Sequence, residues 1–239
     1  IMAVSIDTVY QKVLALANKE QRGYITPQEF NLMADKAQNE IYENYFYQLG
    51  VTELKPKNQM QQSDSKEVIE QKLSFFIEDT PVTENAQGAC SLTSINHSRI
   101  ISVIGQSTNA NKVVERVSAR EISYMLENPL TAPTTNRPIY FFDGTTDFIN
   151  IRPINGTQVN NAYNVFHYVP PHTPNWGYVV VNEKALYNAG TSTNFELHGS
   201  EEENLVMRIL ELSGIIINKP GLAQIAQQDK ASTKQQQNS

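Results

Sequence analysis

The sequence has little cysteine, little histidine and little charge of either sign. Of its 239 residues, one is cysteine, four are histidine and 18% are charged. The single cysteine, Cys90, excludes an intramolecular disulfide and any cysteine-based zinc cluster, and it favours an intracellular protein. The 19 basic residues are outnumbered by 25 acidic ones, so the chain lacks the broad positive field that holds nucleic acid phosphates.

Long hydrophobic runs are absent as well. No stretch approaches the roughly 20 apolar residues that a membrane-spanning helix requires, and the start of the sequence does not resemble a signal peptide. The nucleotide-binding motifs GxGxxG and GxxxxGK[ST] and the hydrolase motif GxSxG do not occur. Side-chain amides are abundant instead, with 23 Asn and 18 Gln, and these residues suit contact surfaces and loops.

Periodic apolar residues predict helices near both ends of the chain. They recur every three or four residues over 5–17, 26–50 and 66–76, with a polar linker over 55–65. Capping boxes, in which Ser or Thr is followed three residues later by Glu, predict helix starts at three places. These are Thr26 with Glu29, Ser118 with Glu121, and Ser200 with Glu203.

Between residues 80 and 195, short apolar runs separated by Pro, Gly and Asn predict β-strands. The expected strands lie at 100–104, 113–117, 139–142, 148–152, 165–169 and 178–181. We therefore expect an α+β protein in which N- and C-terminal helices form a bundle and an antiparallel β sandwich or barrel is inserted between them. The expected parts are a helical part at 1–79, a mostly β part at 80–199, a closing helix at 200–221 and a flexible tail at 222–239.

Residues 18–29 align with the twelve-residue calcium loop of an EF-hand. Asn18, Glu20 and Arg22 fall where calcium needs short oxygen ligands. Because an arginine does not fit inside a dication cage, we favour the alternative that Gly23 makes a turn and Thr26 caps the next helix. We expect no metal at this loop.

The other candidates for chemistry have structural explanations too. Cys90 has no cysteine-enzyme signature near it. Asp143 and Asp147 could form a glycosidase pair, but with Gly144 they are also the residues that a β-hairpin turn requires. No metal-ligand spacing links the four histidines, which are His97, His167, His172 and His198. We therefore expect no catalytic residue, no cofactor and no metal, and a protein that is not an enzyme.

Aromatic residues crowd the end of the second predicted helix and surround more than half of it. They are Tyr42, Tyr45, Phe46 and Tyr47. One core face does not need so many. Either a partner protein or the β part of the same chain is expected to cover the surplus.

Several segments, taken in order, resemble one protein family. They are VYQKVL at 9–14, NKEQRGYITPQEFN at 18–31, PIY at 138–140, INIRP at 149–153, VFHY at 165–168, PHTPNW at 171–176 and FEL at 195–197, followed by the closing helix. The chain resembles the head-to-tail connector proteins of tailed bacteriophages, in particular the adaptor or neck-ring virion proteins of crAss-like and related short-tailed phages. Residues 83–98 depart from the family pattern.

The resemblance implies a structural role. Such proteins form a ring, commonly of twelve copies, which docks beneath the portal protein and extends the DNA channel toward the tail. The implied partners are the portal, further copies of the chain and adjacent neck or tail proteins, with DNA only as passing cargo. The implied location is the virion neck, after assembly in the bacterial cytoplasm. The alternatives are another tail-ring or stopper protein, or a non-viral binding module with a degenerate EF-hand-like loop.

The amphipathic helices supply candidate partner-binding residues, to the extent that the fold does not use them internally. The candidates on the longer helices are Phe30, Met33, Ile41, Leu205 and Ile209. In the C-terminal segment they are Leu222 and Ile225, and we expect this segment to dock on the portal or on an adjacent subunit.

Overall fold

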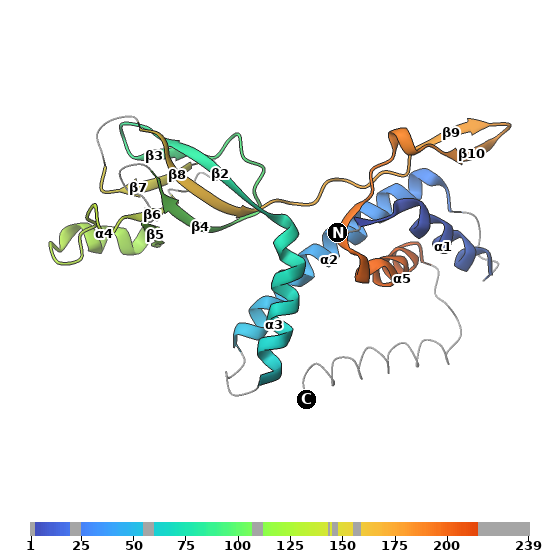
Figure 1. The fold of residues 1–239 in the computed structure, drawn as a ribbon, viewed down its shortest axis with the longest axis horizontal. Coiled ribbons are helices and arrows are strands. Elements are labelled where there is room, and N and C mark those ends of the chain that lie inside the picture. The colour runs from blue at the N-terminus through green and yellow to red at the C-terminus, as the bar shows by residue number, and fades with distance from the viewer. Residues whose placement is uncertain are drawn as a thin grey trace. The chain divides into compact units, whose positions relative to one another are not determined.

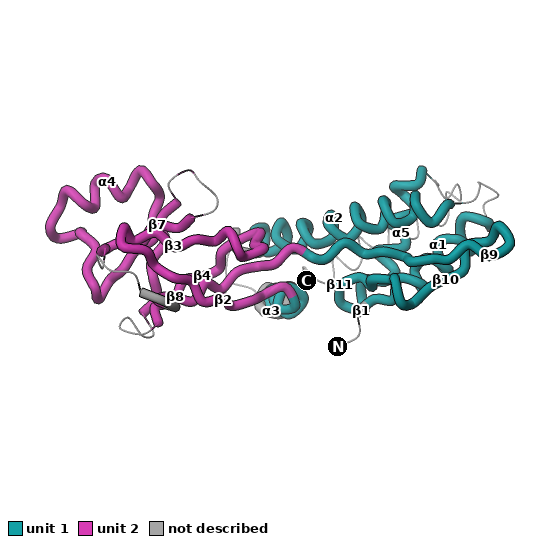
Figure 2. The backbone as a smooth tube through the Cα atoms, turned by 90° about the horizontal axis from the view of Figure 1, so that it is seen from above, with its two compact units in different colours: residues 1–75, 171–239 teal, residues 76–170 magenta. Residues whose placement is uncertain are grey.

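A computed structural model describes residues 3–19, 25–54, 60–106, 112–142, 144, 148–154 and 159–214. It shows a mixed α+β protein that divides into two compact units (Figures 1 and 2). Unit 1 comprises residues 1–75 and 171–239, and unit 2 comprises residues 76–170. Unit 2 is therefore inserted into unit 1 in the sequence.

Unit 2 is a closed β-barrel whose strands are ordered β2-β3-β7-β6-β5-β4-β8. The strands are β2 (Ile77–Glu84), β3 (Ala89–Ser91), β4 (Arg99–Gly105), β5 (Val113–Arg116), β6 (Ile139–Phe141), β7 (Phe148–Arg152) and β8 (Val159–Tyr168). Strands β5 and β6 run parallel, whereas the other neighbours pair antiparallel. The alternating inward side chains fill the barrel, as period-two burial requires. They include Val82, Cys90, Val103, Ile149, Ile151, Tyr163 and Val165.

One helix, α4 (Ala119–Glu127), packs on this barrel. Ser118 caps it, and the Ser118 and Glu121 side chains each bond the other's backbone N–H, so the predicted capping box is confirmed. Buried Ile122 contacts Val117 and Ile139 of the barrel wall. These contacts fix one face of the helix and leave the other side exposed.

Unit 1 contains the other four α-helices of the described residues. They are α1 (Ile6–Lys19), α2 (Pro27–Leu54), α3 (Met60–Leu73) and α5 (Glu202–Leu212), with 3₁₀ turns η1 (Ser74–Phe76), η3 (Ala189–Thr191) and η4 (Gly199–Glu201). Helix α5 contacts both α1 and α2, and α2 contacts α3. Two small antiparallel sheets complete the unit: β1 (Ala3–Val4) with β11 (Phe195–His198), and β9 (Tyr178–Val181) with β10 (Lys184–Tyr187).

The core of unit 1 follows the helical periodicity of the sequence. The buried side chains of α1 recur every three or four residues: Ile6, Val9, Tyr10, Val13 and Ala17. Gln38 is fully buried on α2, where its amide accepts from Glu196 N at 3.0 Å and donates to the His172 carbonyl at 2.8 Å. This one amide joins α2 to β11 and to the segment that precedes β9, because both ends of the side chain are bonded.

The structure corrects several boundaries expected from the sequence. Residues 171–199, expected in the β part, belong to the same unit as the helices. Helix α2 continues through Gly50 to Leu54, and α3 begins at Met60 inside the expected linker. Strands β1, β2, β3, β10 and β11 are additional to the predicted set.

The two remaining capping boxes have different outcomes. The Thr26 box is confirmed, because Thr26 N donates to Glu29 Oε2 at 3.0 Å and Glu29 N donates to Thr26 Oγ1 at 3.3 Å. The Ser200 box is wrong. Ser200 lies in η4, where its N–H donates to His198 Nδ1 at 3.2 Å, and α5 begins after Glu201 without a side-chain cap.

Candidate interaction surface

Unit 1 carries an exposed β-hairpin formed by β9 and β10. Strands β9 and β10 pair only with each other among the described residues, with Val179 opposite Leu186 and Tyr178 opposite Tyr187. Asn182 and Glu183 connect the strands, and both have left-handed backbones, with φ of 49° and 63°. Two consecutive positive φ angles are typical of a type I′ turn, which matches the twist of a two-stranded hairpin.

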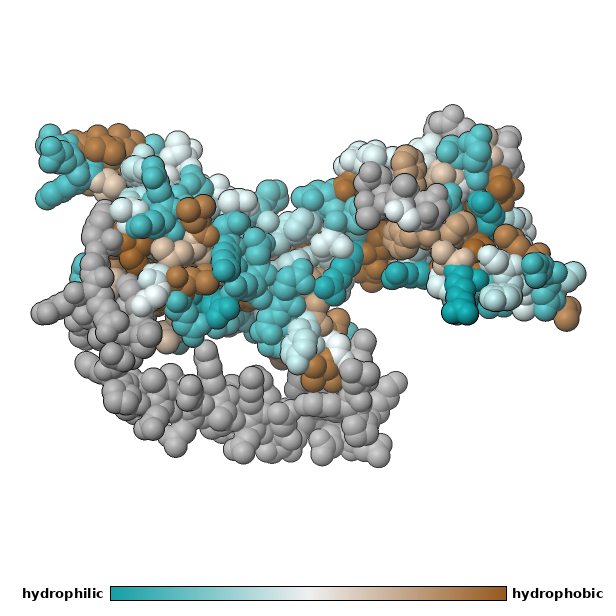
Figure 3. Space-filling model, turned by 180° about the vertical axis from the view of Figure 1, so that it is seen from behind, coloured by the Kyte–Doolittle hydropathy of each residue, from teal (hydrophilic) through white to brown (hydrophobic). Residues whose placement is uncertain are grey.

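The register divides the hairpin into two faces. Opposite residues of an antiparallel pair lie on the same side, so Val179, Val181, Lys184 and Leu186 share one side. We call these four residues the valine face. Its three apolar side chains are 49%, 46% and 53% exposed for Val179, Val181 and Leu186. In Figure 3, brown hydrophobic side chains lie next to the hydrophilic tip of the hairpin at the upper left.

This exposure is unusual for a two-stranded sheet. An isolated hairpin is marginal in water and normally needs a third strand or a helix against its apolar face. Strand β9 reads Tyr-Val-Val-Val, without a charged residue or a proline to block pairing at its edge. A contiguous apolar surface of this kind marks a site of protein contact.

The base of the hairpin is rigidly attached to unit 1 by an aromatic stack. Trp176 is 2% exposed. Its ring lies 5.9 Å from Tyr178, 5.8 Å from Tyr187 and 4.3 Å from Tyr10 of α1, between ring centroids. The two hairpin tyrosines lie on the face opposite to the valine face, which they anchor at its base, whereas Val180 on that same face is 62% exposed.

Hydrogen bonds hold the same tryptophan to both N-terminal helices. The indole Nε1–H donates to Asp7 Oδ1 of α1 at 3.0 Å, and the Trp176 backbone N–H donates to Asn31 Oδ1 of α2 at 2.8 Å. The amide nitrogen of Asn31 donates in turn to Asn175 Oδ1 at 2.9 Å. These hydrogen bonds, two of them part-buried, favour one orientation of the hairpin base.

A second set of bonds closes the strand behind the hairpin. Gly177 N donates to Ser192 Oγ at 3.0 Å, and Asn188 N donates to the Gly177 carbonyl at 2.9 Å. Asn175 and Thr193 exchange backbone bonds of 3.0 and 2.8 Å. The hairpin therefore has a fixed base, while its apolar side chains remain uncovered.

We predict that Glu183→Gly stabilises the hairpin. Glutamate pays a steric cost of about 1 kcal/mol in the left-handed region, and glycine does not. Thermal unfolding followed by circular dichroism should show a higher Tm for this variant. Lys184→Gly is the control, because it places glycine within β10 and should lower Tm; a decrease for both variants would contradict the turn assignment.

Most of the sequence-predicted partner residues lie elsewhere. Phe30, Leu205 and Ile209 are fully buried and Ile41 is 5% exposed, so the core of unit 1 uses them and the expectation of a partner role is corrected for these four. Met33 is half-buried on α2. Leu222 and Ile225 lie outside the described residues. An amphipathic stripe does not distinguish an internal neighbour from an external one.

The aromatic residues at the end of α2 are largely covered within unit 1. Tyr42, Tyr45 and Phe46 are buried, whereas Tyr47 is 72% exposed. The ammonium of Lys72 on α3 lies 5.7 Å from the centroid of the Tyr45 ring. Burial, with the charge of nearby Glu201, raises the pKa of the Tyr45 phenol. Lys72 of α3 and Glu201 of η4 thus lie against Tyr45, one of the aromatic residues for which the sequence predicted either a partner or the β part as cover.

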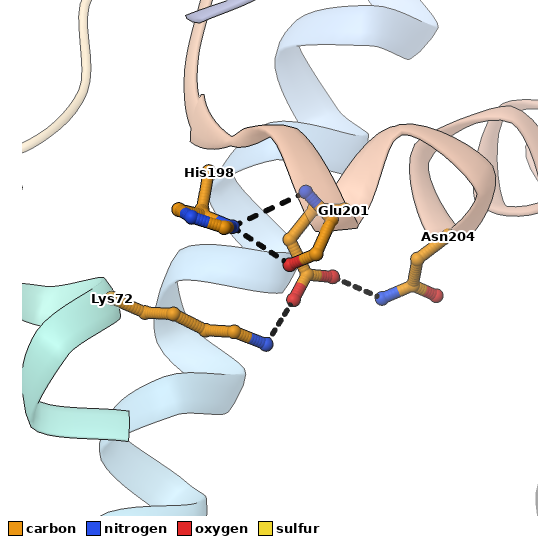
Figure 4. Close-up of polar contacts among 5 residues, drawn as sticks. Lys72, His198, Glu201 and Asn204 are labelled. Atoms are coloured by element: carbon orange, nitrogen blue, oxygen red, sulfur yellow. Dashed lines mark hydrogen bonds and ion pairs between the residues drawn. The ribbon is translucent and has the colours of Figure 1, made fainter. Parts of the chain in front are cut away.

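Glu201 is the centre of a buried polar cluster, shown in Figure 4. It accepts from Lys72 Nζ at 2.6 Å and from Asn204 Nδ2 at 2.9 Å, and it is 7% exposed. Burial alone would raise the pKa of this carboxyl, but the bonds from Lys72 and Asn204 outweigh it and the pKa is lowered. The cluster ties α3 to the start of α5.

This cluster gives a prediction about pH and stability. The pKa of Glu201 is lowered on folding, so its carboxylate stabilises the fold at pH values above the ordinary pKa of 4.5. This contribution is lost as pH falls through the lowered pKa. Glu201→Gln should cost about 2 kcal/mol at neutral pH, since it leaves Lys72 without its partner. Urea unfolding at pH 7 and in the acid range measures both effects.

The neighbouring residue supplies the control for that experiment. Glu202 pairs with Lys12 at 2.6 Å, but their side chains are 29% and 48% exposed. Such surface pairs contribute less than about 1 kcal/mol, so Glu202→Gln should have a small effect at every pH. Equal losses for the two variants would show that burial of Glu201 is energetically unimportant.

The fold brings two of the four histidines together, since the rings of His97 and His167 lie 6.5 Å apart between centroids. Cys90 is buried in the barrel, where burial and the nearby Glu84 carboxylate raise its pKa to about 12. His167 is buried in β8, whereas His172 is exposed and bonds Glu196 at 2.6 Å. In the described part of the chain, no group of three or more His, Cys, Asp or Glu residues is placed to hold a metal ion.

Two sequence candidates fall partly outside the described residues. In the EF-hand-like loop this applies to residues 20–24, and in the proposed hairpin turn it applies to Asp143 and Asp147. The strands on either side of that turn, β6 and β7, do pair antiparallel, with Phe141 opposite Asn150. A β-hairpin at this point is therefore confirmed.

Comparisons with known proteins do not assign the chain to a family. Neither the models of known protein families nor the curated proteins include a match to this chain. Within the described residues, no helix has the length and apolarity needed to cross a membrane.

Proposed function

We propose that the protein is a structural subunit of a larger assembly, and specifically a head-to-tail adaptor or neck-ring protein of a tailed-phage virion. The observation that carries the proposal is the valine face, an exposed apolar sheet surface on a rigidly anchored hairpin. Exposed apolar surfaces of this kind are typical of protein contact sites. The identity proposed for the assembly rests on the resemblance of several sequence segments to connector proteins.

In this proposal the chain binds the portal and further copies of itself, in a ring of about twelve by analogy with the connectors it resembles. The ring extends the DNA channel, with DNA as passing cargo, and adjacent neck or tail proteins bind below it. The contacts of α5 with α1 and α2 support the proposal that these helices correspond to the bundle expected for such subunits. The chain acts by binding and not by catalysis.

The fold is consistent with a subunit that is completed by neighbours. Unit 1 provides a packed core, and partly exposed ion pairs such as Lys12 with Glu202 and Arg208 with Glu40 join its helices at the surface. The hairpin extends from that core without a covering layer of its own. A rigid scaffold with an uncovered apolar element lowers the entropy cost of association.

The test is the mass of the purified chain in solution, measured by light scattering alone and with the portal protein encoded by the same genome. We expect a ring-sized complex in the presence of the portal. A chain that ignores the portal but joins another neck component would favour a tail-ring or stopper protein. A chain that binds neither contradicts the virion proposal.

A calcium titration addresses the binding-module alternative. Arg22 occupies a ligand position of the EF-hand-like loop, so the proposal expects no change in circular dichroism or Tm when calcium is added. A calcium-dependent rise in Tm would favour the non-viral module instead.

Truncation after Pro220 tests whether the C-terminal segment docks on the portal, as expected. Unchanged affinity of the truncated chain for the portal would contradict this docking.

A further inference from the structure

A second group of exposed apolar residues lies on unit 2, at the end of α4 and in the turn after it. Leu130 is 93% exposed and Leu126 is 53% exposed. We call these two residues the leucine knob. Two large apolar side chains exposed this close together in the sequence would gain free energy from burial against a partner.

The turn that carries the knob is well ordered by hydrogen bonds. Asn128 Oδ1 accepts from Leu130 N at 3.0 Å, and the Asn128 carbonyl accepts from both Thr131 N and Ala132 N at 3.0 Å. An Asx turn of this type fixes the backbone on both sides of the leucine. Leu130 is therefore presented by a defined turn that costs little entropy to bind.

A closed ring of identical chains needs two different surfaces on each chain. A head-to-tail contact joins one surface of a copy to the other surface of the next copy, and such contacts form rings when the rotation closes. This chain exposes apolar groups in two separate places, the valine face on unit 1 and the leucine knob on unit 2. The two surfaces are different from each other, as a head-to-tail contact requires.

Each surface carries an exposed charged residue beside its apolar side chains, and these two residues have opposite signs. The valine face ends in exposed Lys184, whereas exposed Glu127 lies directly between Leu126 and the turn of the knob. Opposite charges beside apolar patches set the register of an interface. The charged hairpin tip, Glu183 and Lys184, also disfavours insertion into lipid, where each charge would have to be desolvated.

We infer that the valine face of one copy docks on the leucine knob of the next copy, with Lys184 beside Glu127. The inference deepens the proposed function and rests on it, because it names the contact between ring neighbours. It specifies a heterologous contact between unit 1 of one chain and unit 2 of another.

Cysteine cross-linking tests the contact directly. One chain carries Val181→Cys and a second carries Leu130→Cys, and the mixture is treated with a short bis-maleimide, alone and with the portal. The native Cys90 is buried and its thiol has a pKa of about 12, so it contributes little background. The control replaces Val181→Cys by Val180→Cys, which is 62% exposed on the opposite face.

We expect a covalent dimer from the Val181→Cys and Leu130→Cys mixture at roughly ten times the control yield. A single chain carrying both substitutions should give a ladder of oligomers. Yields equal to the control, both alone and with the portal, would overturn the inference.

Charge reversal separates this contact from general stickiness. Lys184→Glu or Glu127→Lys alone should reduce the cross-link, and the two together should restore it. Failure of the double variant to restore the yield contradicts the assigned register. A ring-sized portal complex without the cross-link would leave the proposed function intact and refute only this contact. The cross-link without portal binding would support this contact and contradict the proposed function.

Discussion

Replacing Val179, Val181 and Leu186 together by threonine should weaken binding of the chain to its assembly partner by about 100-fold. Each side chain is about half exposed in the free chain, so full burial at an interface recovers roughly 1 kcal/mol apiece, and 3 kcal/mol corresponds to about two decades in Kd. Threonine preserves the β-propensity of the strands. Since this face is assigned to the contact between neighbouring copies, sedimentation over a range of chain concentrations, alone and with the portal, measures the change.

The control for this variant is Val180→Thr. Val180 is 62% exposed, more than any residue of the valine face that is replaced, but it lies on the other side of the sheet. A surface that binds through one face predicts nearly unchanged affinity for the control. The triple variant should also unfold at the same urea concentration as the parent chain. Equal loss of binding for both variants would mean that the hairpin acts without the predicted face.

The second large effect is expected at Gly177, where the hairpin meets its base. A Cβ atom at this position would lie 2.2 Å from Thr191 Oγ1, 2.7 Å from the Thr191 carbonyl carbon and 2.8 Å from its oxygen. Two of these atoms are backbone, so a rotamer change of Thr191 does not relieve the clash. Gly177→Ala should therefore destabilise unit 1 by about 3 kcal/mol and also weaken partner binding, since the hairpin base must shift.

Gly190→Ala provides the matched comparison in the same loop. Its added Cβ would meet only Asn188 Oδ1, at 3.4 Å, which is an ordinary contact. Urea unfolding should show a change of less than about 1 kcal/mol for this variant. If Gly177→Ala proves equally mild, the packing between Gly177 and Thr191 does not fix the hairpin.

Local sequence signals predicted those parts of the fold that depend on neighbouring residues. Thr26 and Ser118 begin helices because each meets its glutamate three positions later. The same pattern fails at Ser200, where the His198 ring takes the Ser200 N–H and a 3₁₀ turn forms first. A capping box is therefore a competition between local acceptors, and the sequence alone does not rank them.

The sequence pattern did not predict which β-strands pair when they are far apart in the sequence. The barrel closes through β2 and β8, which are separated by the whole of unit 2 in the sequence, and it includes a parallel pair between β5 and β6. Short apolar runs predicted that strands exist there but not their partners. The division at residues 75 and 171 likewise arises from contacts between distant segments.

The candidate interaction surface was predicted only in part. The apolar run of β9 was recognised as a strand, but β10 was not, because Asn182-Glu183 lacks the glycine that usually marks a two-residue turn. The helical stripes of Phe30 and Leu205 suggested partner contacts, yet the fold buries both. Exposure depends on tertiary packing. The exposed apolar residues place the candidate interface on the hairpin and not on the helices.

Backbone amide hydrogen exchange over residues 178–187 tests the central claim most directly. It should be measured on the free chain and on the chain assembled with the portal. If the valine face is the surface that a partner covers, these amides exchange readily in the free chain and slow by at least about tenfold in the complex, because local opening is suppressed. Unchanged exchange over the hairpin in a fully assembled complex would contradict the account.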